Sequence, residues 1–287
     1  MARSDIRGWV KLHPVASFFV LTYAVSWLAW LPAMLGYQGS ADAALYIIAQ
    51  FGPTLAAFVI VFYAGASIRG WALRIVRWRA SPRWYAVAFG LPAALIGVQG
   101  AVFGLLGYPL DLSSIPGRLV NFLPSAIILA LIAGLGEEPG WRGFALPRLQ
   151  TRYAPILATA LLGVVWAAWH LPLAFVDPRF PHGFTSAALQ ILLALLTMLT
   201  IFFYAFFYTW VYNATQSVLL CMLLHGSFNA AISLLPASFE ALQRGTYVAL
   251  LLVQNVILLA AVAILIVATR GLLAYDAVPE RSTDGTG

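Results

Sequence analysis

The sequence predicts an all-α, polytopic membrane bundle of about eight transmembrane helices. Hydrophobic residues make up 62% of the 287-residue chain and charged residues only 9%, whereas about a quarter of the residues in a typical soluble domain are charged. The apolar residues also come in runs of about 20, which is the length that crosses a bilayer as a helix. These observations exclude an ordinary soluble domain and predict a multi-pass membrane protein.

Eight apolar runs support this fold class. The expected spans are residues 14–35, 43–64, 84–106, 120–147, 155–176, 187–212, 217–236 and 246–269. The first run is longer than the roughly 7–15 apolar residues of a signal peptide, so we expect a retained helix. Residues 1–275 are expected to form one integral membrane domain with its core motifs at 122–230. The polar residues 276–287 are expected to form a disordered tail.

A basic segment, residues 67–79, lies between the second and third spans. Its apolar and basic side chains separate at helical period onto two faces: Trp71, Ile75 and Trp78 against Arg69, Arg74 and Arg77. This separation is typical of a helix that lies on the membrane surface. An ordinary basic loop is the alternative.

The basic residues also predict the orientation of the chain. With eight spans, 13 of the 16 lysines and arginines fall on the side of the termini, and Arg118, Arg179 and Arg244 fall on the other. The positive-inside rule therefore places both termini in the cytoplasm. Because the arginines flank apolar runs, the net charge of +6 indicates topology and not a nucleic-acid partner. The preference for arginine over lysine favours a prokaryotic plasma membrane.

The charged residues inside the expected spans are concentrated in residues 134–143. This stretch of the fourth span contains Glu137, Glu138 and Arg142. A charge at membrane depth costs several kcal/mol or more, so such a residue indicates a functional site by default. The i,i+4 spacing favours an ion pair between Glu138 and Arg142, which leaves Glu137 without a charged partner.

Two of the four histidines lie inside expected spans. His170 is in the fifth span and His225 in the seventh, with Asn229 on the same helical face as His225. Counted from an expected turn at 150–153, Glu137 and His170 lie at similar depths, roughly 20–27 Å away at 1.5 Å per residue. The carboxylate, the histidines and the amide are therefore expected to meet near the middle of the bilayer. His13 and His182 are expected to be interfacial.

These side chains predict acyl hydrolysis by an activated water. Glu137 can take a proton from water, and His170 can share or relay it. His225 and Asn229 are donors suited to the oxyanion that forms when water attacks a carbonyl. No nucleophile-base pair is evident, because Cys221 and Ser227 share a helix with His225 without a third partner.

The motifs resemble those of the CAAX-processing and bacteriocin-processing intramembrane endopeptidases, also called the abortive-infection family. The family motif Glu-Glu-x-x-x-Arg matches residues 137–142. The motif Phe-x-x-x-His matches His170, with Trp166 in place of the phenylalanine. The motif His-x-x-x-Asn matches His225 and Asn229, and the resemblance covers about residues 122–230.

The resemblance implies roles for these residues. Glu137 and His170 would activate water, and His225 with Asn229 would hold the oxyanion. Glu138, Arg142 and Trp166 would support the site. The substrate would be a peptide or protein at the membrane, with a CAAX-like end or a leader peptide, while the physiological substrate and the oligomeric state stay open.

The family is described both as metal-free glutamate proteases and as metalloproteases. If zinc is used, its ligands would be Glu137, His170 and His225, a carboxylate with two histidines. We favour the mechanism without a cofactor, because Glu138 is committed to Arg142 and cannot easily serve as a separate base.

Two other functions remain alternatives: a non-catalytic membrane scaffold, and a proton-coupled transporter that uses Glu137 as its proton carrier. The sequence has no internal repeat, which weakens a transporter built from repeated halves. A scaffold would not need a buried carboxylate without a partner.

Overall fold

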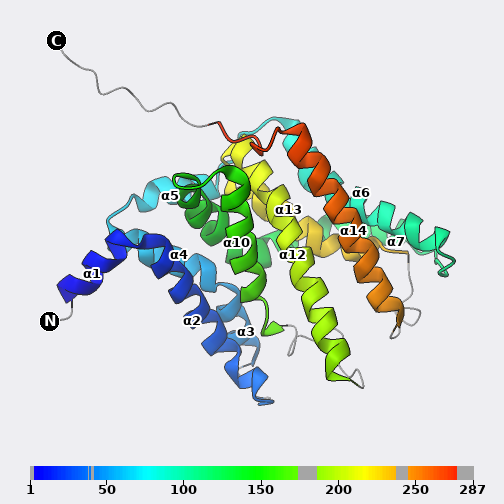
Figure 1. The fold of residues 1–287 in the computed structure, drawn as a ribbon, viewed down its shortest axis with the longest axis horizontal. Coiled ribbons are helices and arrows are strands. Elements are labelled where there is room, and N and C mark those ends of the chain that lie inside the picture. The colour runs from blue at the N-terminus through cyan, green and yellow to red at the C-terminus, as the bar shows by residue number, and fades with distance from the viewer. Residues whose placement is uncertain (1–2, 38, 40–41, 174–185, 237–244, 277–287) are drawn as a thin grey trace, which may run out of the picture.

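A computed structural model of the chain describes residues 3–37, 39, 42–173, 186–236 and 245–276. The elements in chain order are α1 (Arg3–Leu12), α2 (Pro14–Met34), α3 (Asp42–Gln50), α4 (Gly52–Ala64), α5 (Ile68–Ile75), α6 (Pro82–Leu105), α7 (Ile115–Leu129), η1 (Ala130–Gly134), α8 (Leu135–Gly140), η2 (Trp141–Ala145), α9 (Leu146–Gln150), α10 (Pro155–Trp169), α12 (Ala187–Thr215), α13 (Val218–Ala231), η3 (Ile232–Leu234) and α14 (Gly245–Ala268). The described residues contain helices and no strand, which confirms the all-α class (Figure 1).

Five helices are long and apolar enough to cross a membrane: Pro14–Met34, Pro82–Leu105, Ile115–Gln150, Ala187–Thr215 and Tyr247–Ala268. A sixth span results if α3 and α4, which meet at a bend of 55°, are counted together. The helices of residues 155–169 and 218–234 are apolar but shorter. The multi-pass class is confirmed, whereas the count of eight and the cytoplasmic termini stay predictions.

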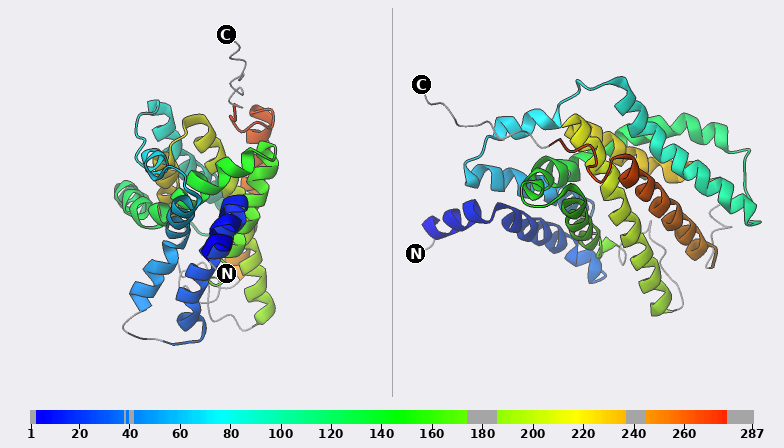
Figure 2. Two further views of the ribbon diagram at one scale, coloured as in Figure 1. Left: turned by 90° about the vertical axis from the view of Figure 1, so that its left-hand side faces the viewer. Right: turned by 45° about the horizontal axis from the view of Figure 1, so that its top comes forward.

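α13 occupies the middle of the bundle. It packs against α6, α7 and α12, and α2 packs against α3 and α4 on the other side of the fourth span (Figures 1 and 2). The turn between α9 and α10 lies at the same end of the bundle as α5 and the start of α13 (Figure 1). His225 on α13 is thereby brought against the carboxylates of α8.

The fourth span is one continuous helical run from Ile115 to Gln150 that contains two π-helical stretches, η1 and η2, on either side of α8. Pro139 has no N–H, so the carbonyl of Leu135 loses its usual helical donor. The hydroxyl of Thr54 donates to that carbonyl at 2.7 Å. The indole of Trp71 donates to the carbonyl of Pro139 at 3.0 Å. In the membrane a freed carbonyl needs a partner from a neighbouring helix, and α4 supplies it for Leu135, while the bond from α5 ties a further carbonyl of the same distorted stretch.

Two expectations about helix limits were wrong. α10 ends at Trp169 and not at residue 176, so His170 caps the helix instead of lying well inside it. Pro172 explains this end, because the ring of a proline disfavours helical backbone at the residue before it. The basic segment is helical only over α5, and Trp78 lies beyond the helix with 64% of its surface exposed. Residues 174–176 and 277–287 lie outside the described residues.

Glycine allows two close approaches to the fourth span. A Cβ added to Gly226 would lie 2.0 Å from the carbonyl oxygen of Ala126, where α13 crosses α7. A Cβ added to Gly140 would lie 2.5 Å from the carbonyl oxygen of Pro53 on α4. Backbone atoms cannot yield as the end of a flexible side chain can, so both sites require a residue without a side chain.

Gly226→Ala is therefore expected to destabilise the bundle by about 1–3 kcal/mol through overpacking. Thermal unfolding of the detergent-solubilised protein measures the effect as a lower midpoint temperature. Gly97→Ala in α6 is the matched control, because no heavy atom lies within 4 Å of its added Cβ. Equal midpoints for the two variants would contradict the proposed close packing of α13 on α7.

Candidate active site

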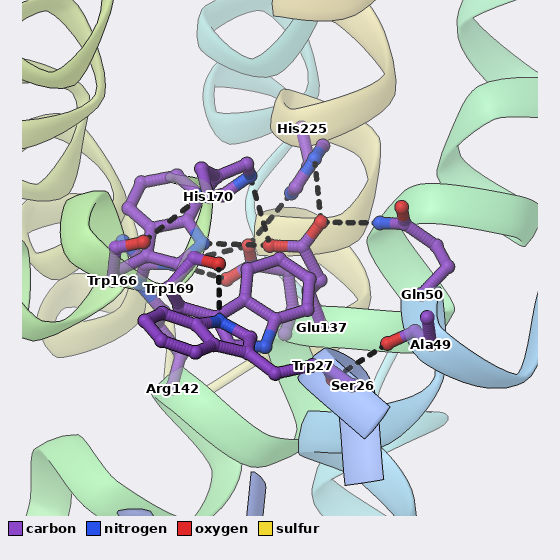
Figure 3. Close-up of polar contacts among 11 residues, drawn as sticks. Ser26, Trp27, Ala49, Gln50, Glu137, Arg142, Trp166, Trp169, His170 and His225 are labelled. Carbon is purple, nitrogen blue, oxygen red and sulfur yellow. Dashed lines mark hydrogen bonds and ion pairs between the residues drawn. The ribbon is translucent and has the colours of Figure 1, made fainter. Parts of the chain in front are cut away.

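Glu137 is a buried carboxylate that receives one hydrogen bond on each oxygen. The amide of Gln50 donates to Oε1 at 2.5 Å, and the indole of Trp166 donates to Oε2 at 2.6 Å (Figure 3). Only 1% of its surface is exposed. The two donors come from α3 and α10, so the orientation of the carboxylate depends on how three segments of the chain pack.

The bend between α3 and α4 places Gln50 beside Glu137. The hydroxyl of Ser26 on α2 donates to the carbonyl of Ala49 at 2.7 Å, which fixes the end of α3 (Figure 3). Gly136 allows the fourth span to approach, since a Cβ there would lie 2.6 Å from the carbonyl oxygen of Gln50. The residue before the first glutamate is thus small because the bend passes directly over it.

The two histidines face different oxygens of Glu137. Nε2 of His170 lies 3.9 Å from Oε2, and Nε2 of His225 lies 3.8 Å from Oε1. Nδ1 of His170 is 2.9 Å from the carbonyl oxygen of Trp166. Because a carbonyl can only accept, Nδ1 carries the hydrogen, and Nε2 of a neutral His170 is an acceptor directed toward Glu137.

A second set of buried charges supports His225. Its Nδ1 lies 2.8 Å from Oε1 of Glu138, and Nη1 of Arg142 donates to both oxygens of that carboxylate at 3.1 Å. The predicted i,i+4 ion pair is therefore present, and both of its side chains are fully buried. The Arg142 guanidinium also lies 4.2 Å from the ring centre of Trp166 and 4.4 Å from that of Tyr208, which adds cation–π stabilisation on its faces.

α2 fixes the end of α10 that carries His170. The indole of Trp27 donates to the carbonyl of Trp169 at 3.1 Å (Figure 3). The hydroxyl of Tyr23 donates to the carbonyl of Val165 at 2.6 Å. The carbonyls at the end of a helix lack donors within the helix. Trp27 satisfies the carbonyl of Trp169, and Tyr23 adds a second hydrogen bond one turn earlier, so the position of His170 does not depend on the short helix alone.

A cavity of about 290 Å³ opens beside these groups. Its lining includes both histidines, Glu137, Gln50 and Asn229, together with apolar and hydroxyl side chains of α12 and α14. Asn229 is exposed and lies four residues from His225, as expected for one helical face. His13 is also exposed, at the junction of α1 and α2, while His182 lies outside the described residues.

The sequence did not indicate two residues that contact the site, Gln50 and Tyr208. Gln50 is the polar residue in the apolar run 43–64 that directly precedes Phe51-Gly52-Pro53, a sequence that favours a break in a helix. The sequence therefore places Gln50 at a break in a helix, but it does not show which group the side-chain amide of Gln50 contacts. Tyr208 sits in an aromatic-rich run where no pattern distinguishes it from a core residue.

The side chains do not fit the suggested zinc site. A zinc ion needs ligand atoms that converge on one point about 2.0–2.1 Å away. The two histidines instead address opposite oxygens of Glu137, and each of these oxygens already accepts a hydrogen bond. Among the described residues, no group of three or more His, Cys, Asp or Glu side chains is arranged to hold a metal ion.

Comparison with known proteins connects this geometry to a family. Residues 119–231, which include the two glutamates and both histidines of the site, match the family described as type II CAAX prenyl endopeptidase Rce1-like. CAAX prenyl protease 2 of Methanococcus maripaludis is 25% identical over an alignment that covers 58% of this chain and 64% of that protein. The match thus leaves about a third of that relative without a counterpart. Over these residues the chain is similar to the Rce1-like CAAX prenyl endopeptidases.

Proposed function

We propose that this protein is an intramembrane endopeptidase that hydrolyses a peptide bond of a membrane-associated substrate by an activated water. One observation carries the proposal: each oxygen of the buried Glu137 faces a histidine Nε2 at 3.8–3.9 Å, beside a cavity. These separations are too long for direct hydrogen bonds and suit a small molecule placed between the groups. The similarity of residues 119–231 to the CAAX prenyl endopeptidases supports the same reaction class.

The water would lie between Glu137 and His170. An oxygen about 2.8 Å from both Oε2 and Nε2 fits between atoms that are 3.9 Å apart. Nε2 of His170 accepts one of its hydrogens and Glu137 accepts the other, which directs a lone pair of the water toward the cavity. This arrangement matches a general base that orients and deprotonates its nucleophile.

The water oxygen then attacks the carbonyl carbon of the scissile peptide as Glu137 takes the proton. His225 and Asn229, which line the same cavity, donate to the oxygen that becomes negatively charged. Glu137 returns its proton to the amine nitrogen as the C–N bond breaks. The products are a carboxylic acid and an amine, and no cofactor enters the balance.

A protonated His225 suits its surroundings. Its Nδ1–H donates to the carboxylate of Glu138, and Nε2–H is then free to donate to the oxyanion. The two carboxylates of the site face one arginine, so protonation of His225 brings the summed charge of the four groups to zero. A neutral sum lowers the cost of holding these charges in a membrane-embedded site.

The similarity to CAAX prenyl endopeptidases and the position of the site support a substrate class. We propose a peptide or protein whose end lies at the membrane, of the CAAX-like or leader-peptide type. The cavity lining combines apolar side chains such as Ile201, Phe228 and Leu251 with hydroxyl and amide groups such as Thr200 and Gln254. Such a lining can hold an extended peptide, because the polar groups can pair with its backbone while the apolar ones contact its side chains.

Glu137→Gln is expected to lower cleavage about 10²–10⁴-fold, because the amide cannot accept the proton of the water. Cleavage is measured with a prenylated CAAX-type peptide on protein reconstituted in liposomes, and by comparing membrane peptide termini from wild-type and variant cells. Asp111→Asn is the matched control, since it makes the same chemical change at an exposed loop position. Identical peptide termini in wild-type and Glu137→Gln cells, with pH-coupled substrate flux instead, would support a transporter.

Trp166→Phe is expected to lower kcat about tenfold with little change in KM. It removes the donor to Oε2 of Glu137 and keeps an aromatic face against Arg142. Trp169→Phe is the matched control, because its indole N–H has no hydrogen-bond acceptor in the described part of the chain. An equal loss of activity in Trp166→Phe and Trp169→Phe, at equal stability, would show that the hydrogen bond from Trp166 to Glu137 does not contribute to catalysis.

Incubation with a strong chelator is expected to leave activity unchanged, because the proposed mechanism uses no metal. The assay is run without added metal on protein dialysed against the chelator. Full loss of activity that zinc alone restores would reject the metal-free mechanism and return Glu137, His170 and His225 to the role of ligands.

A further inference from the structure

Three arginines gather around one buried tyrosine, away from the candidate active site. Arg74 lies on α5, Arg77 directly follows it, and Arg148 lies on α9. All three are close enough to act electrostatically on the hydroxyl of Tyr212, near the end of α12, and Arg74 and Arg148 also act on each other as like charges. We call these four residues the arginine cluster.

Hydrogen bonds hold the segments that carry the cluster. The Trp71 indole fixes α5 to the fourth span, and the hydroxyl of Ser217 donates to the carbonyl of Arg77 at 2.5 Å. Nη1 of Arg148 donates to the carbonyl of Phe144 at 2.9 Å, and its guanidinium lies 3.8 Å from the ring centre of Phe144. Packing therefore fixes the segments that carry the three charges; Arg74 and Arg148 are half-buried, and Arg77 is exposed at the edge of the cluster.

Within the part of the chain that the structure describes, the cluster has no negative partner. No ion pair joins any of its arginines to an acidic side chain within the described ranges. Nε of Arg74 and the hydroxyl of Tyr212 are buried donors without an acceptor among the described residues, and only 1% of Tyr212 is exposed. Like charges held together beside unpaired buried donors are unfavourable unless an anion joins them.

We propose that the arginine cluster binds a phosphoryl group. Guanidinium groups match phosphate oxygens in geometry as well as charge, and three of them suit a group with more than one negative charge. The Tyr212 hydroxyl adds a neutral donor at the base of the site. The phosphoryl group can belong to a phospholipid headgroup or to a free phosphate.

Neighbouring residues favour the lipid as the source. Three apolar side chains on α5 and just beyond its end are exposed: Leu73 at 55% of its surface, Val76 at 62% and Trp78 at 64%. Exposed apolar side chains next to arginines are typical of a segment at the surface of an anionic membrane. The cluster also joins α5 to α9 and α12, at the end of the bundle that carries the α9–α10 turn (Figure 1). A bound phosphoryl group would therefore clamp α5 to the span that carries Glu137.

The test uses the full-length protein in nanodiscs of phosphatidylcholine, with or without phosphatidic acid. A second arm adds inorganic phosphate to the phosphatidylcholine sample, against chloride at equal ionic strength. We expect phosphatidic acid to raise the midpoint of thermal unfolding, and lipid retention in native mass spectrometry to give the relative affinity. A shift with phosphate as well would show that the phosphoryl group alone is recognised, whereas a shift with lipid alone would identify the headgroup.

Arg74→Gln is expected to weaken retention of phosphatidic acid about tenfold, because it removes a charged hydrogen-bond donor. Tyr212→Phe is expected to weaken it about threefold, because it removes a neutral donor. Tyr212→Phe keeps the packed ring, so it tests the site even if Arg74→Gln folds poorly. Arg69→Gln is the control, because it removes the same charge from an exposed position on the same helix. No shift in either arm, or equal losses for Arg69→Gln and Arg74→Gln, would overturn the proposal.

Discussion

The ion pair between Glu138 and Arg142 is the interaction on which the rest of the candidate site depends. Both side chains are fully buried, and the carboxylate also accepts from His225. Removing one partner of a buried pair leaves an uncompensated charge and typically costs about 3–5 kcal/mol. The pair therefore fixes two things together: the register of the π-helical stretch that carries Arg142, and the ring of the histidine that faces the cavity.

Both glutamates can be used because they are adjacent on the regular helix α8. In a regular helix, adjacent side chains point about 100° apart, so Glu137 and Glu138 address different neighbours. Pro139 then frees the carbonyl of Leu135, to which Thr54 of α4 donates, and Trp71 of α5 donates to the carbonyl of Pro139 itself. The two segments that flank the site are thus bonded to the backbone around this proline, and one of them, α4, begins two residues after Gln50.

The sequence allowed much of the fold and part of the site to be predicted. Charged and imidazole groups are rare within apolar runs, so Glu137, His170 and His225 could be recognised from their position alone. Similar distances in sequence from a turn also indicated that Glu137 and His170 would lie near each other, and Nε2 of His170 is 3.9 Å from Oε2 of Glu137. The number of spans was harder to predict, because hydropathy does not show where a helix such as α10 stops short of the expected length.

The partners of Glu137 could not be predicted, because they depend on packing between segments distant in sequence. Gln50 is 87 residues away and reaches the carboxylate only through the bend between α3 and α4. The hydrogen bonds of α2 to Ala49, Val165 and Trp169 likewise depend on tertiary structure and leave no periodic signal. Local patterns identify which groups carry charge, whereas the groups that orient them are ordinary polar residues in apolar runs.

Trp166 illustrates this difference most clearly. The motif indicated only that Trp166 is an aromatic residue in the place of a phenylalanine, one turn before His170. In the structure its edge and its face do different things: the indole N–H donates to Glu137, and the ring lies against the guanidinium of Arg142. An indole has a positive edge and a negative face, so one side chain stabilises an anion and a cation at once. A phenylalanine offers only the face, and the replacement therefore changes how the carboxylate is held, not merely which aromatic ring fills the space.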